Sequence, residues 1–285
     1  MSVIEPRPFT LGPALLFCPA DQPERYTKAA ERADAVILDL EDAVAPGAKA
    51  AAREALLAHP LDPERTVVRI NPMGSPEFEL DLKAIRRSAY RTVMLAKAEL
   101  DAGTVIASRL HPGLKDFSVI ALLETALGVT QAQMLARLPE VVALMWGAED
   151  LVASLGGSSS RTAEGQYRAV AQQARSQVLL AAGAFGKAAI DAVYLDLSDL
   201  PGLAAEADDA AASGFTAKAC IHPAQVAVIR SSYAPSEEQI AAAREVLAAD
   251  AASATGVFQL NGRMVDAPIL RQAEQILRRA AAAQS

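Results

Sequence analysis

The stretch "AVILDLEDAV", residues 35–44, joins four apolar residues to three carboxylates, Asp39, Glu41 and Asp42. A short continuous apolar run is typical of a strand that is buried on both faces. A carboxylate in an apolar interior is costly unless it is paired, hydrogen-bonded or bound to a metal. The stretch therefore predicts a buried strand that ends at a polar, chemically equipped edge.

Seven other short apolar runs recur along the chain, separated by alanine-rich segments with helical spacing. They lie at residues 14–20, 66–71, 92–97, 118–124, 142–148, 192–197 and 217–223. Strands that alternate with helices form right-handed parallel units, and this number of them favours a closed barrel over an open doubly wound sheet. We expect an α/β fold, the TIM (β/α)8 barrel.

Two parts of the chain exceed what such a barrel needs. The interval between the sixth and seventh runs contains "LGGSSSRTAEGQ", residues 155–166, which predicts a mobile loop, followed by a helix to about residue 184. After the eighth run the chain continues with a helix whose start, Ser236 to Gln239, has the pattern of a capping box, and it ends in an amphipathic helix. We expect a barrel domain at 1–230 and an extension at 231–285.

The composition limits the classes of partner. Of the 285 residues, 52% are hydrophobic, which is ample for a core. The net charge of -7, with scattered Lys and Arg, argues against a nucleic acid or an anionic membrane as the main partner. The apolar runs are too short to span a bilayer and the N-terminus has no signal-peptide pattern, so we expect a cytoplasmic protein. Cys18 and Cys220 lie in apolar runs, which favours core packing.

Polar side chains collect at the predicted strand ends, where TIM barrels carry their active sites. Several carboxylates at one rim repel one another unless a divalent cation or arginines compensate them, and the absence of Cys/His ligand spacing favours Mg²⁺ over zinc. Glu124 and Asp150 are the preferred ligands, because they end apolar strands that are neighbours. The full set comprises Asp39, Glu41, Asp42, Arg69, Asn71, Lys97, Glu99, Glu124, Glu149, Asp150 and His222.

Each candidate also has a purely structural interpretation. Asp42 would serve as a helix cap, and Arg69 would only neutralise Glu41 in an ion pair. Lys97 would extend along the barrel mouth without touching a ligand. For His222, which precedes a proline, a structural hydrogen bond is favoured over catalysis.

Six segments together resemble one family in their order along the chain. They are "LLFCPADQPERYTKA", "VILDLEDAV", "VVRIN", "ALLETALGV", "WGAEDL" and "CIHPAQV". The chain is similar to the citrate lyase β-subunit-like branch of the HpcH/HpaI aldolase superfamily, which includes malyl-CoA, citramalyl-CoA and related 3-hydroxyacyl-CoA lyases. The likeness covers nearly the whole chain and is more specific for the family than for the substrate.

The resemblance implies Mg²⁺, or Mn²⁺ in its place, and Claisen-type cleavage or formation of a carbon–carbon bond in a thioester. By position it implies Glu124 and Asp150 as metal ligands and Arg69 as the group that binds a substrate oxygen. The stretch "NGRMVDAPIL" aligns Asp266 with an aspartate that enters a neighbouring subunit's active site. The extension would then be a lid that packs on a neighbouring subunit, usually in a trimer or a dimer of trimers.

The remaining site residues receive supporting roles. We expect Asp39, Glu41 and Asp42 to orient Arg69 and metal-bound water without binding the metal themselves. Contacts to the phosphates of coenzyme A are expected from Arg25, Lys28 and Lys97, with Arg25 first because it lies in the matched "CPADQPER" motif; a solvent-exposed charge is the alternative for each.

Three functions of a thioester-binding protein remain open at this point, beside a metal-dependent aldolase of free hydroxy-oxo acids, whose usual histidine base has no clear match near the first two strands. The first is a stand-alone lyase of citramalyl-, malyl- or hydroxymethylglutaryl-CoA that releases acetyl-CoA and an oxo acid. The second is a citrate lyase β subunit acting on a citryl thioester of an acyl-carrier protein. The third is a CoA-binding module without turnover, and the acyl group itself is set by pocket walls that a sequence does not reveal.

Overall fold

The computed structural model describes residues 9–100, 110–252 and 256–282. The chain divides into two compact units, residues 1–229 and 230–285. The division falls inside the helix α9 (Pro223–Tyr233). Each unit is described below by itself.

In the described part of the first unit, eight parallel strands close into a barrel in chain order, with β8 pairing back to β1. The expected TIM barrel is confirmed. The carboxyl ends of all strands lie at one mouth of the barrel, as in every parallel barrel. The strands are β1 (Ala14–Pro19), β2 (Ala35–Asp39), β3 (Thr66–Ile70), β4 (Thr92–Leu95), β5 (Ser118–Leu123), β6 (Val141–Trp146), β7 (Ala188–Asp191) and β8 (Ala217–Cys220).

The seventh strand differs from the prediction. Residues 192–197 were expected to form it, but β7 is Ala188–Asp191 and the predicted residues follow it without regular structure. The register explains this difference, because Ala143 of β6 pairs with Ala188 and Met145 pairs with Ile190. The alanines of β7 have no strand propensity of their own, whereas the apolar residues after it line the barrel mouth.

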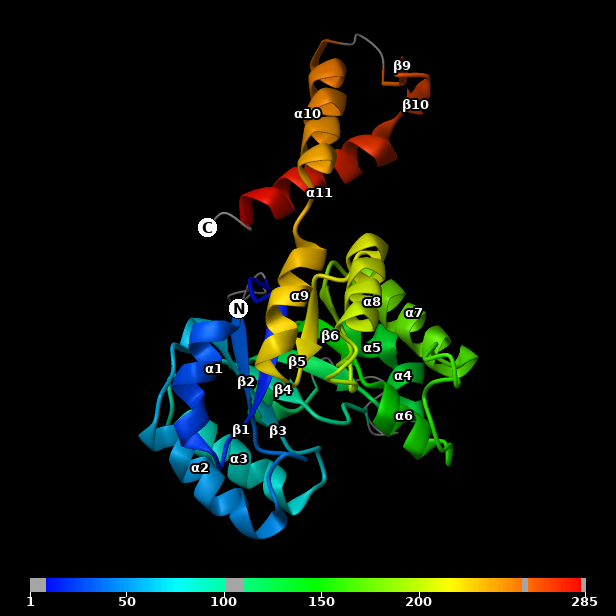
Figure 1. Cartoon of the computed structure of the whole chain (residues 1–285). Helices are drawn as coiled ribbons and strands as arrows, with labels where there is room; N and C mark the ends of the chain where they lie inside the picture. Colours follow the sequence, from blue (N-terminus) through cyan, green and yellow to red (C-terminus); the bar gives the residue numbers. More distant parts are fainter. Residues whose placement is uncertain (1–8, 101–109, 253–255, 283–285) are drawn as a thin grey trace. The chain divides into compact units, whose positions relative to one another are not determined.

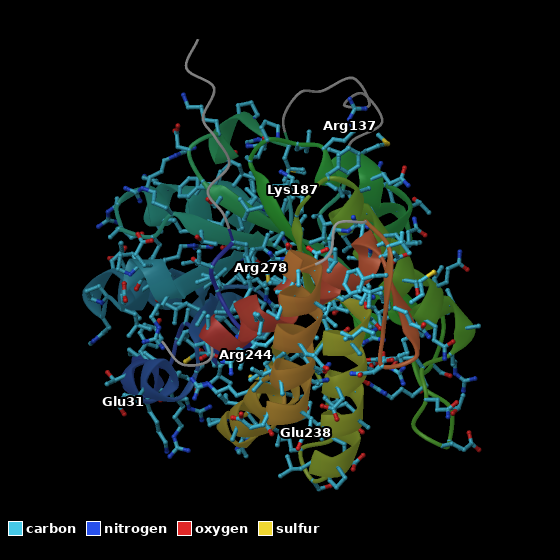
Figure 2. The ribbon with its side chains drawn as sticks, turned by 90° about the horizontal axis from the view of Figure 1, so that it is seen from above. Glu31, Arg137, Lys187, Glu238, Arg244 and Arg278 are labelled. Carbon is cyan, nitrogen blue, oxygen red and sulfur yellow. The ribbon has the colours of Figure 1, made fainter. Side chains whose placement is uncertain are left out.

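Helices surround the barrel, and Figure 1 shows them on the outside of the strands. Their outer faces carry charge, as Figure 2 shows for Glu31 of α1 and Arg137, which follows α5. No helix among the described residues has the length and apolar character needed to cross a membrane. The helices of this unit are α1 (Tyr26–Arg32), α2 (Lys49–Ala58), α3 (Pro76–Arg86), α4 (Ala126–Thr130), α5 (Ala132–Ala136), α6 (Ala148–Ser154), α7 (Ala169–Ala184) and α8 (Leu200–Ser213).

The barrel interior is filled by apolar side chains that alternate along each strand. Ile37 of β2, Val67 of β3 and Leu122 of β5 belong to this buried cluster. Side chains two residues apart on a strand share a face, so the next inward positions are Asp39, Arg69 and Glu124. The alternation that packs the core thus delivers these polar groups to the mouth.

The second unit contains α10 (Glu237–Ala252), a hairpin of β9 (Phe258–Leu260) and β10 (Arg263–Val265), and α11 (Ala267–Ala282). The predicted capping box is confirmed, because the Gln239 N–H donates to Ser236 Oγ at 3.2 Å and the Ser236 N–H donates to Gln239 Oε1 at 2.9 Å. Asn261 and Gly262 have positive φ angles of 49° and 78°, as a tight hairpin turn requires. The helices α10 and α11 pack against each other, and Figure 2 shows Arg278 of α11 among the exposed charges.

Candidate active site

A cavity of about 260 Å³ opens at the carboxyl ends of the barrel strands. One side is charged and is formed by residues at or just after the carboxyl ends of β2, β3, β5 and β6. The other side is apolar and includes Phe17 of β1, with Val193, Leu195 and Ile221 after β7 and β8. The sequence-predicted residues that line it are Asp39, Asp42, Arg69, Glu124, Glu149 and Asp150.

Arg69 is held in place by a carboxylate from the neighbouring strand. Its Nε and Nη2 atoms donate to the two oxygens of Asp39 at 2.7 and 2.6 Å, and its Nη1 lies 3.1 Å from Glu41 Oε2. The guanidinium also stacks 4.9 Å above the ring of Phe17. Burial opposes the charge of Arg69, but Asp39 outweighs it and raises the pKa of Arg69. These contacts do not exhaust the donors of a guanidinium, so Arg69 presents a fixed cation to the cavity.

Asp39 and Glu41 are themselves fixed by the backbone of their own turn. Asp39 accepts hydrogen bonds from the N–H groups of Glu41 at 2.8 Å and Ala43 at 3.1 Å. Burial raises the pKa of Glu41, although Arg69 and Lys97 oppose this shift. The turn after β2 therefore forms a rigid anionic cradle for Arg69, whereas the Asp42 side chain is mostly exposed.

Lys97 projects into the same group of carboxylates. Its ammonium donates to Glu41 Oε1 at 2.7 Å and lies 3.7 Å from Asp42, 3.6 Å from Asp150 and 4.0 Å from Glu124. Burial opposes its charge, but the hydrogen bond to Glu41 and the other carboxylates outweigh it and raise the pKa of Lys97. Lys97 is therefore one of the cations that compensate this rim.

Glu124 follows β5 and Asp150 lies in the first turn of α6, after β6. The two strands are hydrogen-bonded neighbours, with Leu123 paired to Trp146, so both carboxylates face the same cavity. Glu124 is only 3% exposed, and burial together with the charge of Asp150 raises the pKa of Glu124 to about 7. A buried carboxylate beside another carboxylate is a site that favours a bound cation.

The backbone of the turn after β6 passes very close to Glu124. A Cβ atom at Gly147 would lie 2.9 Å from both Cβ and Oε2 of Glu124. Glycine therefore permits the approach that brings Asp150 to the same cavity. Among the described residues no group of three or more His, Cys, Asp and Glu has the arrangement of a full metal cage. Two carboxylates with the remaining positions left to water and substrate oxygens suit Mg²⁺.

A buried ionic network outside the barrel holds the segment that carries Asp150. Trp146 donates its indole N–H to Asp191 at 2.7 Å, and Asp191 is bound by the ammonium of Lys218 at 2.9 Å and by Arg175. Burial opposes the charge of Asp191, but Lys218 and Arg175 outweigh it and lower the pKa of Asp191. No feature of the sequence linked these positions, which come from β6, β7, β8 and α7.

The loop at 155–166 takes part in this arrangement. Arg161 stacks 3.7 Å above the ring of Tyr167 and its guanidinium forms an ion pair with Glu206 at 2.7 Å. The neighbouring Ser160 is buried and donates to Glu149 at 2.5 Å, directly before Asp150. The contacts of Ser160 and Arg161 therefore attach the loop to the rest of the barrel unit. The Gly/Ser composition of the loop did not indicate this attachment.

Lys49 is a further residue of the rim that the sequence did not reveal. Its ammonium donates to the backbone carbonyls of Leu40 and Glu41 at 2.8 and 3.0 Å and to Asn71 at 2.9 Å. Lys49 lies on α2, and only its reach back to the turn after β2 gives it this position. It fixes the backbone of the turn that holds Arg69.

The other predicted site residues lie apart from the cavity lining. Arg25 and Lys28 are exposed and belong to the helical segment directly after β1, at the same end of the barrel. His222 is exposed and accepts a hydrogen bond from the Ala224 N–H, in line with a structural role. Asp266 belongs to the second unit, where it is half-buried and precedes α11; the Ile269 N–H lies 3.5 Å from its Oδ1.

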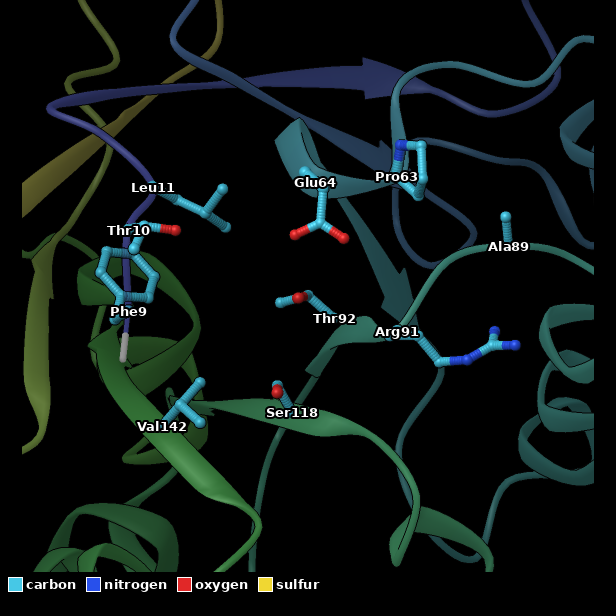
Figure 3. Close-up of a pocket in the computed structure, with 10 residues that line it drawn as sticks. All are labelled: Phe9, Thr10, Leu11, Pro63, Glu64, Ala89, Arg91, Thr92, Ser118 and Val142. Carbon is cyan, nitrogen blue, oxygen red and sulfur yellow. The ribbon is translucent and has the colours of Figure 1, made fainter. Parts of the chain in front are cut away.

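Two other hollows differ from the cavity at the barrel mouth in the residues that line them. One of about 60 Å³ lies at the amino ends of the strands, where Figure 3 shows Glu64 and Thr92 across from Phe9 and Leu11. The other, of about 430 Å³, lies beside the start of α3 and holds the pair His111 and Glu79 at 3.8 Å. Neither combines the buried carboxylates and fixed arginine of the barrel mouth.

Comparison with known proteins identifies the family. The model of the HpcH/HpaI aldolase/citrate lyase family matches residues 14–223, which is the barrel as far as the start of α9. The chain belongs to this family. It is therefore an enzyme of the lyase class, and the resemblance seen in the sequence is confirmed.

Individual relatives are similar in sequence to this chain over nearly its whole length. A citrate lyase subunit beta-like protein of Mycobacterium tuberculosis is 56% identical over 274 residues, covering 96% of this chain and 97% of the relative. The human mitochondrial citramalyl-CoA lyase is 33% identical over 288 residues, covering 92% of this chain and 83% of the relative. These relatives include lyases of coenzyme A thioesters.

Among solved structures, the fold is similar to that of the M. tuberculosis protein CitE in complex with magnesium, acetoacetate and coenzyme A. The TM-score is 0.87 at 55% identity, covering 95% of this chain and 99% of the other. Another CitE structure, in complex with magnesium and pyruvate, has a TM-score of 0.79 at 51% identity over 94% of this chain and 99% of the other.

Proposed function

We propose that this protein is a Mg²⁺-dependent carbon–carbon lyase that cleaves a short 3-hydroxyacyl-CoA thioester to acetyl-CoA and an oxo acid, or forms it by the reverse condensation. Citramalyl-, malyl- and hydroxymethylglutaryl-CoA are the substrates of this class. The observation that carries the proposal is the convergence of Glu124, Asp150 and the clamped Arg69 on one cavity. Its apolar side suits an acyl group and its charged side suits a carboxylate and a metal.

Glu124 and Asp150 are the groups that would hold the metal. When bound, Mg²⁺ would act as a Lewis acid on the substrate's oxygens. Cleavage would break the bond between C2 and C3 of the thioester as the C3 hydroxyl gives its proton to the ionised carboxylate of Asp266, the candidate acid/base, and the electron pair would remain on the acetyl group as an enolate. Arg69 would stabilise the negative charge that develops on the thioester oxygen, a contact that is stronger in the transition state than in the substrate.

Asp39, Glu41 and Asp42 support this chemistry without binding the metal. Asp39 holds both nitrogens of the guanidinium edge of Arg69, so it sets the direction in which the remaining donors point. Glu41 bridges Arg69 and Lys97. Arg25 and Lys28 are assigned to the phosphates of coenzyme A, because they are exposed cations directly after β1 at the same barrel mouth.

Asp266, supplied by a neighbouring subunit of a homotrimer, is assigned as the acid that protonates the CH2 carbon of the enolate and so gives the methyl group of acetyl-CoA. Asp266 follows a hairpin whose Met264 is 69% exposed. An apolar side chain displayed beside an ionisable group suits a lid that closes over a substrate. The unit at 230–285 would then cover the active site of the next subunit.

A complementation experiment tests this arrangement. Asp266→Ala and Glu124→Gln proteins are each expected to be inactive, but coexpression gives mixed trimers in which some sites combine an intact Glu124 with an intact Asp266. Random mixing in a cyclic trimer would restore about a quarter of the wild-type activity. Absence of any recovery in mixed trimers verified by mass spectrometry would contradict a shared site.

The substrate is identified by a coupled assay with citramalyl-, malyl- and hydroxymethylglutaryl-CoA. We expect one of them to give equal amounts of acetyl-CoA and oxo acid, with the reaction abolished by EDTA and by Asp266→Ala. Failure to cleave any thioester, with coenzyme A binding intact, would favour a binding module without turnover.

A citrate lyase β subunit is the second candidate, since the E. coli citrate lyase subunit beta is 35% identical over 266 residues. In that case a citryl group on an acyl-carrier protein, and not a free CoA thioester, would be cleaved. The two candidates are separated by comparing citryl-carrier with the CoA panel under the same conditions.

A further inference from the structure

Lys97 occupies an unusual position for a lysine. It follows β4 with a positive φ of 47°, a left-handed backbone that a residue with a Cβ rarely adopts. Hydrogen bonds on both sides hold this conformation: the Ala96 N–H donates to Ile70 at 3.2 Å and the Ala98 N–H donates to Leu122 at 2.9 Å. A glycine would adopt it without strain, so the retained side chain points to a function for the ammonium group.

The backbone of Lys97 binds one of the proposed metal ligands directly. Its N–H donates to Glu124 Oε1 at 3.0 Å. The side chain then returns over the same carboxylate, so that the ammonium lies 4.0 Å from Glu124 and 3.6 Å from Asp150. The two carboxylates assigned to Mg²⁺ therefore share a cation that is covalently attached to the chain.

The charges around Lys97 come from each strand end at this side of the mouth. The turn after β2 supplies Glu41 and Asp42, and β3 supplies Arg69. Arg69 is committed to Asp39 and Glu41, so Lys97 is the cation within 4.0 Å of both Glu124 and Asp150 in the described part of the chain. A divalent cation bound between these two carboxylates would lie close to the Lys97 ammonium, and the two positive charges would repel each other.

The Lys97 ammonium also has carboxylate partners outside the proposed metal site. The ammonium already donates to Glu41 at 2.7 Å and lies 3.7 Å from Asp42, two carboxylates that the proposed function does not assign to the metal. Its side chain is 31% exposed, so it has room to move toward solvent and the turn after β2. Displacement therefore costs contacts with the two ligands but keeps the ion pair with Glu41.

We propose that Lys97 is a tethered counter-cation that occupies the metal site in the metal-free enzyme and competes with the divalent cation for Glu124 and Asp150. Lys97 thereby keeps the metal affinity moderate, so that the ion binds firmly only when an anionic substrate adds its own negative charge. This inference rests on the proposed function, because it takes Glu124 and Asp150 as the metal ligands. It assigns Lys97 a different role from contact with the phosphates of coenzyme A.

The test is a comparison of Mn²⁺ affinity, measured by electron paramagnetic resonance on the full chain without substrate. Lys97→Met removes the charge but keeps an unbranched side chain, and we expect it to bind Mn²⁺ at least about tenfold more tightly than the wild type. Lys97→Arg keeps the charge and is expected to stay near the wild-type affinity. Lys83→Met, which removes an exposed lysine on α3, is the matched control and is expected to have no effect.

Unchanged or weaker binding by Lys97→Met would overturn the proposal, because a lysine that only positions Glu41 would not compete with the metal. Failure of the wild type and of every variant to bind Mn²⁺ would instead contradict the metal site of the proposed function. A measurement on the wild type covers the case in which Lys97→Met does not fold. Mg²⁺ is expected to increase acetylation of Lys97 by an amine-reactive ester several-fold relative to Lys83, and an unchanged ratio would contradict displacement.

Discussion

Replacing Glu124 by glutamine is expected to stabilise the metal-free protein and to remove its response to magnesium. Burial and the charge of Asp150 raise the pKa of Glu124 from 4.5 to about 7, which corresponds to about 3 kcal/mol of unfavourable free energy for the ionised form. The glutamine keeps the acceptor for the Lys97 N–H, which donates to Glu124 Oε1 at 3.0 Å. The substitution therefore removes the charge with little change in shape.

The sign of the pH dependence follows from the two states. The unfolded chain loses the Glu124 proton near pH 4.5, whereas the folded protein keeps it until about pH 7. At Glu124 the folded state binds more protons in this window, so the contribution of Glu124 to the free energy of unfolding falls as the pH rises through it and is level above. Relative to the wild type, Glu124→Gln is expected to gain up to about 3 kcal/mol at pH 8 and almost nothing near pH 4.5.

Urea denaturation of both proteins in EDTA at several pH values measures this difference, and other titrating groups cancel in it. Glu31→Gln, at an exposed position on α1, is the matched control and is expected to show no such trend. Adding Mg²⁺ should raise the denaturation midpoint of the wild type and leave that of Glu124→Gln unchanged. A variant that is less stable than the wild type at pH 8, or a difference that does not shrink at low pH, would refute the reasoning.

Three other changes test separate parts of the site. Asp39→Asn loosens Arg69 and should lower kcat about 10- to 100-fold with little change in Mn²⁺ affinity; an unchanged kcat would contradict the supporting role. Asp191→Asn removes one of the carboxylates that pair with the buried Lys218, while Glu206 at 2.8 Å remains, and should lower the free energy of unfolding in urea by about 3 kcal/mol, with partial recovery on adding Lys218→Met; additive losses would contradict a coupled network. Removing metal with EDTA should lower the calorimetric melting temperature of the wild type, and restoring Mg²⁺ should recover it; an EDTA-insensitive transition would argue against a bound ion.

The sequence was sufficient for the barrel because its strands are buried on both faces and therefore read as apolar runs. The stretch at 35–44 begins at the first residue of β2, and the strand ends at Asp39, the first of its three carboxylates. The seventh strand was misplaced because its alanines carry a helical preference, and only pairing with β6 selects Ala188–Asp191. Local pattern failed where tertiary register decides the structure.

Part of the candidate site could be predicted from the sequence for the same reason. Asp39, Arg69 and Glu124 continue the inward alternation of their strands, so their convergence follows from the fold class. The sequence placed Lys97 at the end of its strand, but its contacts with Glu124 and Asp150 could not be predicted, because they depend on a left-handed backbone and on the direction of a long side chain.

The support behind the site lay beyond sequence reasoning altogether. Trp146 and Asp191 are 45 positions apart, and Lys218 is 27 positions from Asp191. Outward-facing charges on β7 and β8 pair only once the barrel has closed. Lys49 likewise reaches its carbonyl partners only through the fold of the turn after β2.

Cleavage of the identified thioester in deuterium oxide tests the central claim most directly. The account predicts acetyl-CoA that carries one solvent deuterium in its methyl group, formed in equal amount with the oxo acid and only when Mg²⁺ is present. Release of free coenzyme A with the acyl carbon skeleton intact would show thioester hydrolysis instead and would contradict a carbon–carbon lyase.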